Sequence, residues 1–288
     1  MNTLLNTLLN TLLLDVDDLN ISFATRRGEV KAVRGVSFTL GREKLGIVGE
    51  SGSGKSQTGR AILGLTPASA RITAKRLKFA GIDLLNADEK QMREIRGDRI
   101  SMVMQDPKYS LNPVMTVGRQ ISEAYRAHTK ASRLQARAKT LEMLEAVRIR
   151  NPIRVYKAYP HEVSGGMGQR IMIAMMLITG PDLLIADEPT SALDVTVQLQ
   201  VLAILDDLVT QRGMGLIFIS HDLNLVASFC DRVLVMYGGR VLEECKASEL
   251  QQAKHPYTRG LLNCLPRVDG RQQTLPVLKR DPAWLGSE

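Results

Sequence analysis

The stretch that decides the fold is LGIVGESGSGKS, Leu45–Ser56. A short apolar run at residues 45–48, typical of a strand, leads to Gly49, and residues 55–63 have a pattern typical of a helix. This is the P-loop pattern G-x-x-x-x-G-K-[ST] in the strand, loop, helix order that it needs. Because Gly49, Gly52 and Gly54 have no Cβ, the backbone can take positive φ there and wrap its N–H groups around phosphate oxygens.

The end of the loop carries the charged chemistry. Lys55 can neutralise phosphate as a point cation, and the Ser56 hydroxyl can take one position on Mg²⁺, which prefers oxygen ligands. The helix that follows points its positive end at the same place. A glycine-rich turn with a chance lysine is the alternative, but the order of the elements disfavours it.

Composition sets the class of protein. With 288 residues, 44% of them hydrophobic, the chain can bury a full core, which predicts one globular unit with subdivisions. No uncharged apolar run approaches the roughly 20 residues that span a bilayer, so we expect a soluble or peripheral protein. The net charge of +8 is spread along the chain, which favours a solvated basic face over a nucleic-acid-binding arm.

The three cysteines are Cys230, Cys245 and Cys264. They show no metal-binding spacing and their number is odd, so free thiols in a reducing cytosol fit best.

The N-terminal part begins with three Asn-Thr-Leu-Leu repeats at residues 2–13, which we interpret as an accessory tail. Alternation of apolar and polar residues over 13–40 predicts a β-hairpin that turns at residues 26–28. Phe23 in this hairpin could stack on a base, although a buried strand phenylalanine is nearly as good an interpretation.

The rest of the chain alternates strands and helices. Strands are expected at 71–79, 100–104, 183–186, 215–219, 232–236 and 240–244, and helices at 88–96, in two stretches between 116 and 148, and at 167–179, 195–211, 248–254 and 257–265. Polar residues that follow apolar strands in this order predict a parallel α/β sheet whose carboxyl edge holds the ligand.

Three of these strand-end residues could act on a phosphate. Asp187 could hold the water shell of Mg²⁺ opposite Ser56, and Glu188 could take a proton from the attacking water. His221 could donate to the γ-phosphate. An acidic pair at a strand end is usually a solvated turn, and a lone histidine is usually structural, so the weight of these residues comes from the P-loop.

Ser164-Gly165-Gly166 offers a second place for an anion: a hydroxyl and two bare N–H groups at a helix N-terminus. An ordinary serine N-cap followed by a flexible glycine pair is the alternative.

Taken together, these motifs resemble those of an ABC-type ATPase. GESGSGKS, Gln105 after an apolar strand, VSGGM followed by GQR, LLIADEPTSALD and ISHD stand in that family's order and spacing, over about residues 13–245. QDPKYSLNP at 105–113, YPHEVSGGM at 159–167, HPYTRGLL at 255–262 and the pair Ser56-Gln57 resemble one subfamily, the ATP-binding subunits of oligopeptide, dipeptide and nickel importers.

The resemblance implies a role for each matching residue. Glu188 would be the general base, His221 the switch histidine, and Gln105 the residue that senses Mg²⁺ and the attacking water, while residues 191–194 would form the D-loop that crosses to the partner. Mg²⁺ would be held by Ser56, Gln105 and Asp187. The residues that would bind ATP are Phe23, which stacks on adenine, then Gly49, Glu50, Ser51, Gly52, Ser53, Gly54, Lys55, Ser56 and Gln57, and in the signature motif Ser164, Gly165, Gly166 and Met167.

The resemblance also implies the architecture: an α/β, P-loop (RecA-like) ABC ATPase core with an antiparallel β subdomain and an inserted helical subdomain. The expected parts are a repeat tail at 1–12, the nucleotide-binding core at 13–105 and 164–245, the helical subdomain at 106–163, and a C-terminal extension of the peptide-importer type at 246–288.

The implied function is ATP hydrolysis that drives dimer closure and solute uptake, most simply of di- or oligopeptides, with nickel or another small solute as the alternative. Implied partners are two transmembrane permeases, a solute-binding protein acting indirectly, and a second ATPase, for which Ser56-Gln57 favours a distinct relative over a second copy. The expected location is the cytoplasmic face of the cell (inner) membrane.

Two residues depart from the family pattern: Val163 stands where leucine is usual, and Gly168 where a basic residue is usual. A glycine inside a helix costs about 1 kcal/mol relative to alanine. With only Cys264 in the C-terminal region, we expect no iron–sulfur site.

Other function classes fit less well. An ABC-type ATPase that acts on nucleic acid or ribosomes usually adds a coiled-coil insert, zinc modules or a second cassette, and the sequence has no interleaved aromatic and basic surface for stacking bases. A signalling GTPase would need an Asn-Lys-x-Asp segment, which is absent from the sequence.

Overall fold

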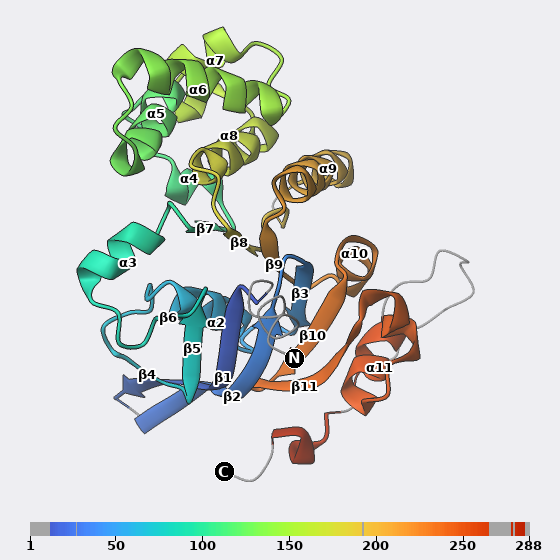
Figure 1. Ribbon diagram of the computed structural model, residues 1–288. Helices are drawn as coiled ribbons and strands as arrows, with labels where there is room; N and C mark the ends of the chain where they lie inside the picture. The colour runs from blue at the N-terminus through green and yellow to red at the C-terminus, as the bar shows by residue number, and fades with distance from the viewer. Residues whose placement is uncertain (1–11, 27, 192, 265–277, 279, 286–288) are drawn as a thin grey trace, which may run out of the picture. The chain divides into compact units, whose positions relative to one another are not determined.

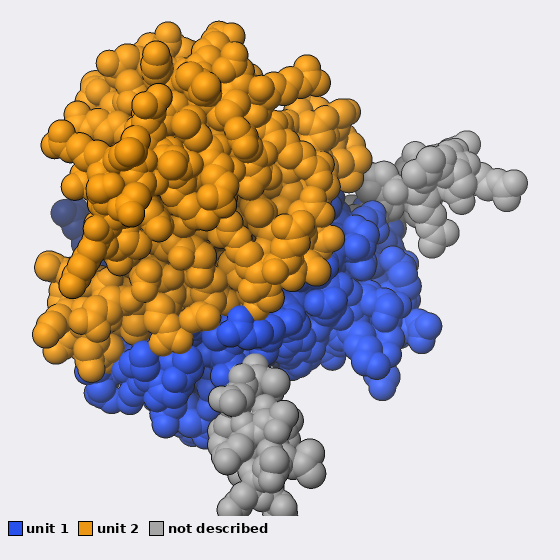
Figure 2. Space-filling model, turned by 45° about the horizontal axis from the view of Figure 1, so that its top comes forward, with its two compact units in different colours: residues 1–86, 218–288 blue, residues 87–217 orange. Residues whose placement is uncertain are grey.

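The computed structural model describes residues 12–26, 28–191, 193–264, 278 and 280–285. The Asn-Thr-Leu-Leu repeat lies outside the described residues except for its last two leucines. The chain forms two compact units: unit 1 consists of residues 1–86 and 218–288, and unit 2 of residues 87–217 (Figure 2). This division differs from the expected boundaries at 105/106 and 163/164, which remain a prediction.

Unit 1 contains an antiparallel sheet (Figure 1). Its strands are β1 (Leu14–Thr25), β2 (Gly28–Leu40), β4 (Ala70–Thr73), β5 (Arg76–Phe79) and β6 (Ile82–Asp83). The first two form the predicted hairpin, the order continues β2-β1-β5-β6, and β4 pairs with the second half of β1. Alternate residues of β2 from Val36 onward are buried, as the period-2 pattern requires.

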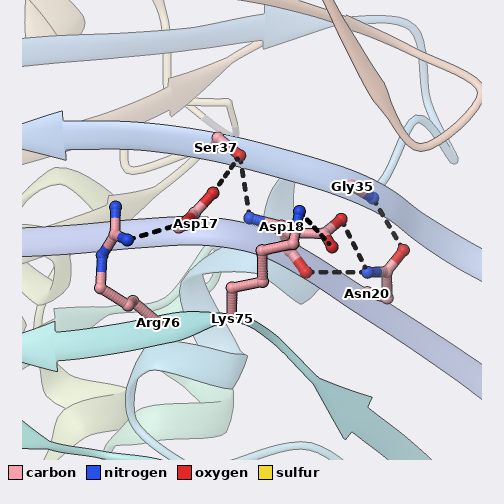
Figure 3. A network of polar contacts seen from close by, with 7 residues as sticks. All are labelled: Asp17, Asp18, Asn20, Gly35, Ser37, Lys75 and Arg76. Atoms are coloured by element: carbon pink, nitrogen blue, oxygen red, sulfur yellow. Dashed lines mark hydrogen bonds and ion pairs between the residues drawn. The ribbon is translucent and has the colours of Figure 1, made fainter.

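A β-bulge divides β1 into two parts, and polar side chains stabilise it (Figure 3). Asp18 has φ 55°, a left-handed conformation that Asp and Asn tolerate better than most residues. Its N–H donates to Ser37 Oγ at 2.8 Å, and the Asn20 side chain donates to the Asp18 carbonyl at 2.8 Å and accepts from the N–H of Gly35 at 2.8 Å. The bulge therefore turns the strand without leaving these groups unpaired.

Because β1 is divided, its partner is divided too. Residues 14–17 pair with β5 and residues 20–23 with β4. The prediction of one strand over 71–79 was wrong at Lys75, where the chain leaves one half of β1 for the other. There the Lys75 N–H donates to the Asp17 carbonyl at 2.9 Å, and the Lys75 ammonium lies 3.4 Å from Asp18.

The P-loop strand also belongs to unit 1. Strand β3 (Lys44–Gly49) runs parallel to β10 (Arg232–Tyr237), which forms an antiparallel hairpin with β11 (Arg240–Lys246). Helix α10 (Leu223–Phe229) packs on β3. A Cβ at Gly46 would lie 2.2 Å from Val226 Cγ1, so only glycine allows this close approach of helix and strand.

The remaining elements of unit 1 are helical: α2 (Lys55–Ile62), η2 (Ala247–Gln252), α11 (Pro256–Asn263) and η3 (Pro282–Leu285). The predicted helix at 248–254 was wrong in type, because η2 is a 3₁₀-helix. Strand β9 (Gly215–Ser220) lies across the boundary between the two units in the sequence.

Unit 2 is mostly helical, with one pair of parallel strands, β7 (Ile100–Val103) and β8 (Leu183–Asp187). Its helices are α3 (Glu89–Ile95), α4 (Pro107–Ser110), α5 (Val117–His128), α6 (Arg133–Ala146), α7 (Pro152–Lys157), the 3₁₀-helix η1 (Pro160–Glu162), α8 (Gly165–Leu177) and α9 (Val195–Arg212). The two predicted helices between 116 and 148 are confirmed, and they pack with α7 and α8 in one cluster (Figure 1).

Candidate nucleotide-binding site

The P-loop connects the end of β3 to the start of α2, as predicted. Its glycines Gly49, Gly52 and Gly54 have φ values of 151°, 80° and 98°. A Cβ would lie 2.1 Å from the Met236 carbonyl oxygen at the first position and 2.5 Å from the Ala32 carbonyl oxygen at the third. The loop therefore needs glycine there for both its backbone angles and its packing.

Polar contacts hold the loop in shape. The buried Lys55 ammonium donates to the carbonyl oxygens of Gly49 and Glu50, each at 2.8 Å. Ser53 Oγ and Gln57 Oε1 are buried without a hydrogen-bond partner among the described residues. Buried polar atoms are normally paired, so these two atoms suit a loop that takes a polar ligand.

The C-terminal part of unit 1 also contacts the loop, at Glu50. The Glu50 N–H donates to Tyr257 Oη at 3.3 Å, and its carboxylate forms an ion pair with Arg280 at 3.0 Å. Tyr257 is fully buried, and burial raises its pKa to about 12. Its ring lies against those of Tyr237 and Trp284. Sequence reasoning predicted a helix at this tyrosine but missed the contact, because the spacing of 207 residues carries no local signal.

The other predicted residues of unit 1 lie on different elements. Phe23, half-buried in β1, is paired with Val30 of β2 and Ala70 of β4. His221 is exposed directly after β9, where the next residue, Asp222, caps α10 by accepting from the N–H of Leu225 at 3.1 Å.

In unit 2, three predicted residues lie around the end of β8. Asp187 is the last residue of that strand and is 5% exposed. Glu188 follows with φ 46°, and its Oε2 accepts from Gln105 Nε2 at 3.2 Å. The N–H and the hydroxyl of Ser191 both donate hydrogen bonds to the Glu188 carbonyl oxygen. A glutamate held at positive φ is strained, and such strain is found most often at functional sites.

The predicted signature residues form the first turn of α8. Ser164 is the N-cap, and its Oγ accepts from the Met167 N–H at 3.4 Å. A Cβ at Gly165 would meet nothing within 4 Å, whereas one at Gly166 would lie 2.5 Å from Val197 Cγ1 of α9. Ser164 is therefore an ordinary helix N-cap, which was the alternative to an anion site. Gly166 allows helices α8 and α9 to pack closely.

The predicted site residues divide between the units: Phe23, residues 49–57 and His221 belong to unit 1, and the others to unit 2. The P-loop after a parallel strand and the strand-end acidic residues together define a P-loop nucleotide-binding protein of the α/β class. Among the described residues, we find no helix that combines the length and apolar character needed to cross a membrane.

Comparison with known proteins gives the family. The model of the family described as ABC transporter matches residues 33–191, more than half of the chain. The chain belongs to the ABC transporter family, so the predicted resemblance and the ABC-type ATPase are confirmed.

Curated relatives are peptide-transport proteins by name. The chain is 52% identical to the probable peptide ABC transporter ATP-binding protein y4tR of Sinorhizobium fredii, with 92% of this chain and 81% of that protein covered. It is 47% identical to the oligopeptide transport ATP-binding protein OppD of Salmonella typhimurium (94% and 81% covered). Identity to the dipeptide transport ATP-binding protein DppD of Bacillus subtilis is 50% (89% and 78% covered).

Solved structures of ABC cassettes have the same fold. The dimeric bacterial ABC transporter cassette MJ0796 matches with a TM-score of 0.73 at 26% identity, covering 82% of this chain and 99% of that one. Its post-hydrolysis form bound to ADP and Pi matches with a TM-score of 0.71 at 25% identity, covering 82% and 99%. The predicted fold class is confirmed.

Proposed function

We propose that this chain is the ATP-binding and ATP-hydrolysing subunit of an importer for di- or oligopeptides. The observation that carries the proposal is the P-loop of residues 49–56, a glycine cradle with a buried lysine, in a chain 47–52% identical to peptide-transport ATP-binding proteins. Phosphates of ATP would accept from the N–H groups of this loop, and Lys55 would exchange its carbonyl contacts for phosphate oxygens.

Mg²⁺ fits the oxygen chemistry of the residues that would hold it. Ser56, the carboxylate of Asp187 and the amide oxygen of Gln105 are the hard ligands that this ion prefers, and the ion would neutralise charge on the phosphates when bound. Glu188 would take the proton of the attacking water, since Gln105 already orients its carboxylate at 3.2 Å. His221 would donate to the γ-phosphate, and Phe23 would stack on adenine.

Dimerisation would complete the nucleotide site. Ser164 and the N–H groups of Gly165 and Gly166 lie at the N-terminus of α8, where backbone donors and the helix dipole favour an anion. We propose that they bind the γ-phosphate held by the P-loop of a second ATPase subunit, which we expect to be a distinct relative. Closure of this pair would drive two permeases at the cytoplasmic face of the membrane, and a solute-binding protein would deliver the peptide.

The first prediction tests Glu188 as the general base. Glu188→Gln removes the base and leaves the phosphate contacts, so we expect hydrolysis to fall at least about 100-fold while ATP binding persists. Phosphate release and equilibrium binding of labelled ATP are measured on the purified chain with its partner subunits. Glu145→Gln, an exposed change on α6, is the matched control. Normal turnover in Glu188→Gln would remove this residue from the catalytic role.

The assembly is tested by affinity purification of the tagged chain from solubilised native membranes, followed by a salt wash. Recovery of two multispanning permeases and a second ATPase supports the importer. Recovery of nucleic acid or ribosomal proteins without a membrane subunit would contradict the proposed role in transport, but not the proposed ATPase activity. The solute is then identified by measuring uptake of a labelled tripeptide and, separately, of nickel in cells that carry the chain and in cells that lack it.

A further inference from the structure

Unit 2 contains a strongly basic cavity that the proposed function does not use. It has a volume of about 570 Å³, within the range of roughly 300–1,000 Å³ typical of small-molecule sites. Residues between α6 and α7, and residues of α7, η1, α8 and α9, line it. The cationic residues of its wall are Arg148, Arg150, Arg154, Lys157 and Arg170, and its one carboxylate is Glu162. We call this cavity the basic pocket.

Few acidic groups balance these charges. Arg148 forms an ion pair with Asp207 at 2.6 Å. Arg150, Arg154 and Lys157 have no carboxylate partner within the part of the chain that the structure describes. Positive charges gathered without counter-charges repel one another, and they attract an anion to the cavity.

Arg170 differs from the other cations of this wall because they are exposed and it is not. It is half-buried, its Nη2 donates to Gln200 Oε1 at 2.7 Å, and its Nη1 donates to the Arg148 carbonyl oxygen at 3.3 Å. Its Nε is buried and has no hydrogen-bond partner among the described residues. Burial, and then the charges of Arg148 and Arg150, lower the pKa of Arg170. A half-buried guanidinium with neutral partners alone is costly, and an anion in the pocket would offset that cost.

We propose that the basic pocket binds a small molecule that carries two or more phosphate groups. Several arginines around one cavity favour phosphate, because the planar guanidinium donates two parallel hydrogen bonds to its oxygens. The number of cations matches an anion of several charges, and the volume matches a small molecule.

The position of the basic pocket gives its ligand a route to the ATPase. Val163 and Met167 line the cavity on either side of Ser164 in the sequence, and Ser164 caps α8 by accepting from the Met167 N–H. A bound ligand would therefore contact the neighbours of the signature serine. Binding itself does not rest on the proposed function, whereas an effect on the rate of hydrolysis does.

Inorganic tripolyphosphate, added alone, is the probe. Because the P-loop also binds phosphates, the titration uses the full chain carrying Lys55→Ala and measures heat and stoichiometry. We expect one site per chain. Adding Arg150→Glu with Arg154→Glu, both exposed in α7 or just before it, should weaken binding at least tenfold. The matched control adds Lys130→Glu with Arg133→Glu, two exposed cations outside the pocket, and should change binding less than twofold.

Three results would overturn the proposal. The Lys55→Ala chain could fail to bind tripolyphosphate, both double variants could weaken binding equally, or tetraglutamate could bind as tightly as tripolyphosphate. The last result would assign the pocket to an acidic polypeptide segment. ATP binding to the Arg150→Glu, Arg154→Glu chain with an intact P-loop is measured alongside, so that a failure of the nucleotide site is recognised separately.

Discussion

Tyr257 shows how a single side chain can fix the P-loop from a distance. Its hydroxyl accepts from the N–H of Glu50 at 3.3 Å, and the tyrosine itself is fully buried. Tyr257→Phe keeps the ring and removes the acceptor, which leaves the N–H unpaired and costs about 1–3 kcal/mol. We expect a lower free energy of unfolding for unit 1 in urea. If about 1 kcal/mol of this cost weakens the ATP-bound form of the loop, the ATP dissociation constant should be about five times higher.

Tyr237→Phe is the control for this prediction, since it also removes a hydroxyl from the same aromatic cluster. Unchanged stability and unchanged ATP affinity in Tyr257→Phe would show that the hydroxyl does not hold the loop.

Residues whose roles depend on neighbours in the sequence could be predicted, and residues joined across the fold could not. The P-loop spacing fixes Lys55 and Ser56 at the start of a helix because strand, loop and helix are consecutive. The positive φ of Glu188 and its contact with Gln105 had no such local signal, since 83 residues separate the two side chains. The ion pair of Arg280 with Glu50 is a further case.

Helix α8 contains two glycines with different reasons to be there. A Cβ at Gly168 would lie 3.6 Å from Pro107 Cγ, which is ordinary contact, while one at Gly166 would lie 2.5 Å from Val197 Cγ1. Gly168→Ala should therefore raise the free energy of unfolding by about 1 kcal/mol, because alanine is the better helix former. Gly166→Ala should lower it, because the stiff valine must move.

Thermal or urea unfolding of the two single variants, followed by circular dichroism, checks this pair. Destabilisation by Gly168→Ala would mean that the departure from the family pattern at this position has a packing role. ATPase rates of the same variants show whether rigidity of the signature helix affects turnover.

At the scale of elements, long periodic segments were predictable and short ones were not. The helix at 117–128 follows from its amphipathic pattern, and the helix at 133–146 from its many strong helix formers. Helix α7 has only six residues, too few for a period, although Asn151 before Pro152 is a start signal that could have found it. The break at Lys75 depends on a bulge in another strand, so the alternation over 71–79 could not reveal it.

For the whole molecule, each unit supplies part of the proposed chemistry: phosphate binding from unit 1, and the base and the signature from unit 2. The motif order predicts this division of roles, because the P-loop precedes and the acidic pair follows the predicted helical subdomain. The basic pocket could not be predicted as a cavity from the sequence, since its cations are spread from Arg148 to Arg170 among apolar and neutral residues.

Alkaline pH should destabilise the molecule through two buried acids of unit 1. Burial raises the pKa of Cys230 from 9.0 to about 12, and it raises the pKa of Tyr257 from 10.0 to about 12. Between its unfolded and its folded pKa, each group loses its proton in the unfolded chain and keeps it in the folded chain. The free energy of unfolding therefore has its full value below pH 9 and falls as the pH rises toward 12. From pH 8 to 10 the thiol alone should remove about 1.4 kcal/mol.

Urea unfolding followed by the fluorescence of Trp284, the one tryptophan of the sequence, measures this loss. Cys230→Ala lowers stability at every pH by opening a small cavity, but it should also abolish the part of the pH 8 to 10 decrease that the thiol causes. The difference between variant and wild type from pH 7 to 8 serves as the baseline, because neither state ionises the thiol there. An identical decrease in both proteins would show that the folded chain lets Cys230 ionise as readily as the unfolded one, and that other groups cause the alkaline loss.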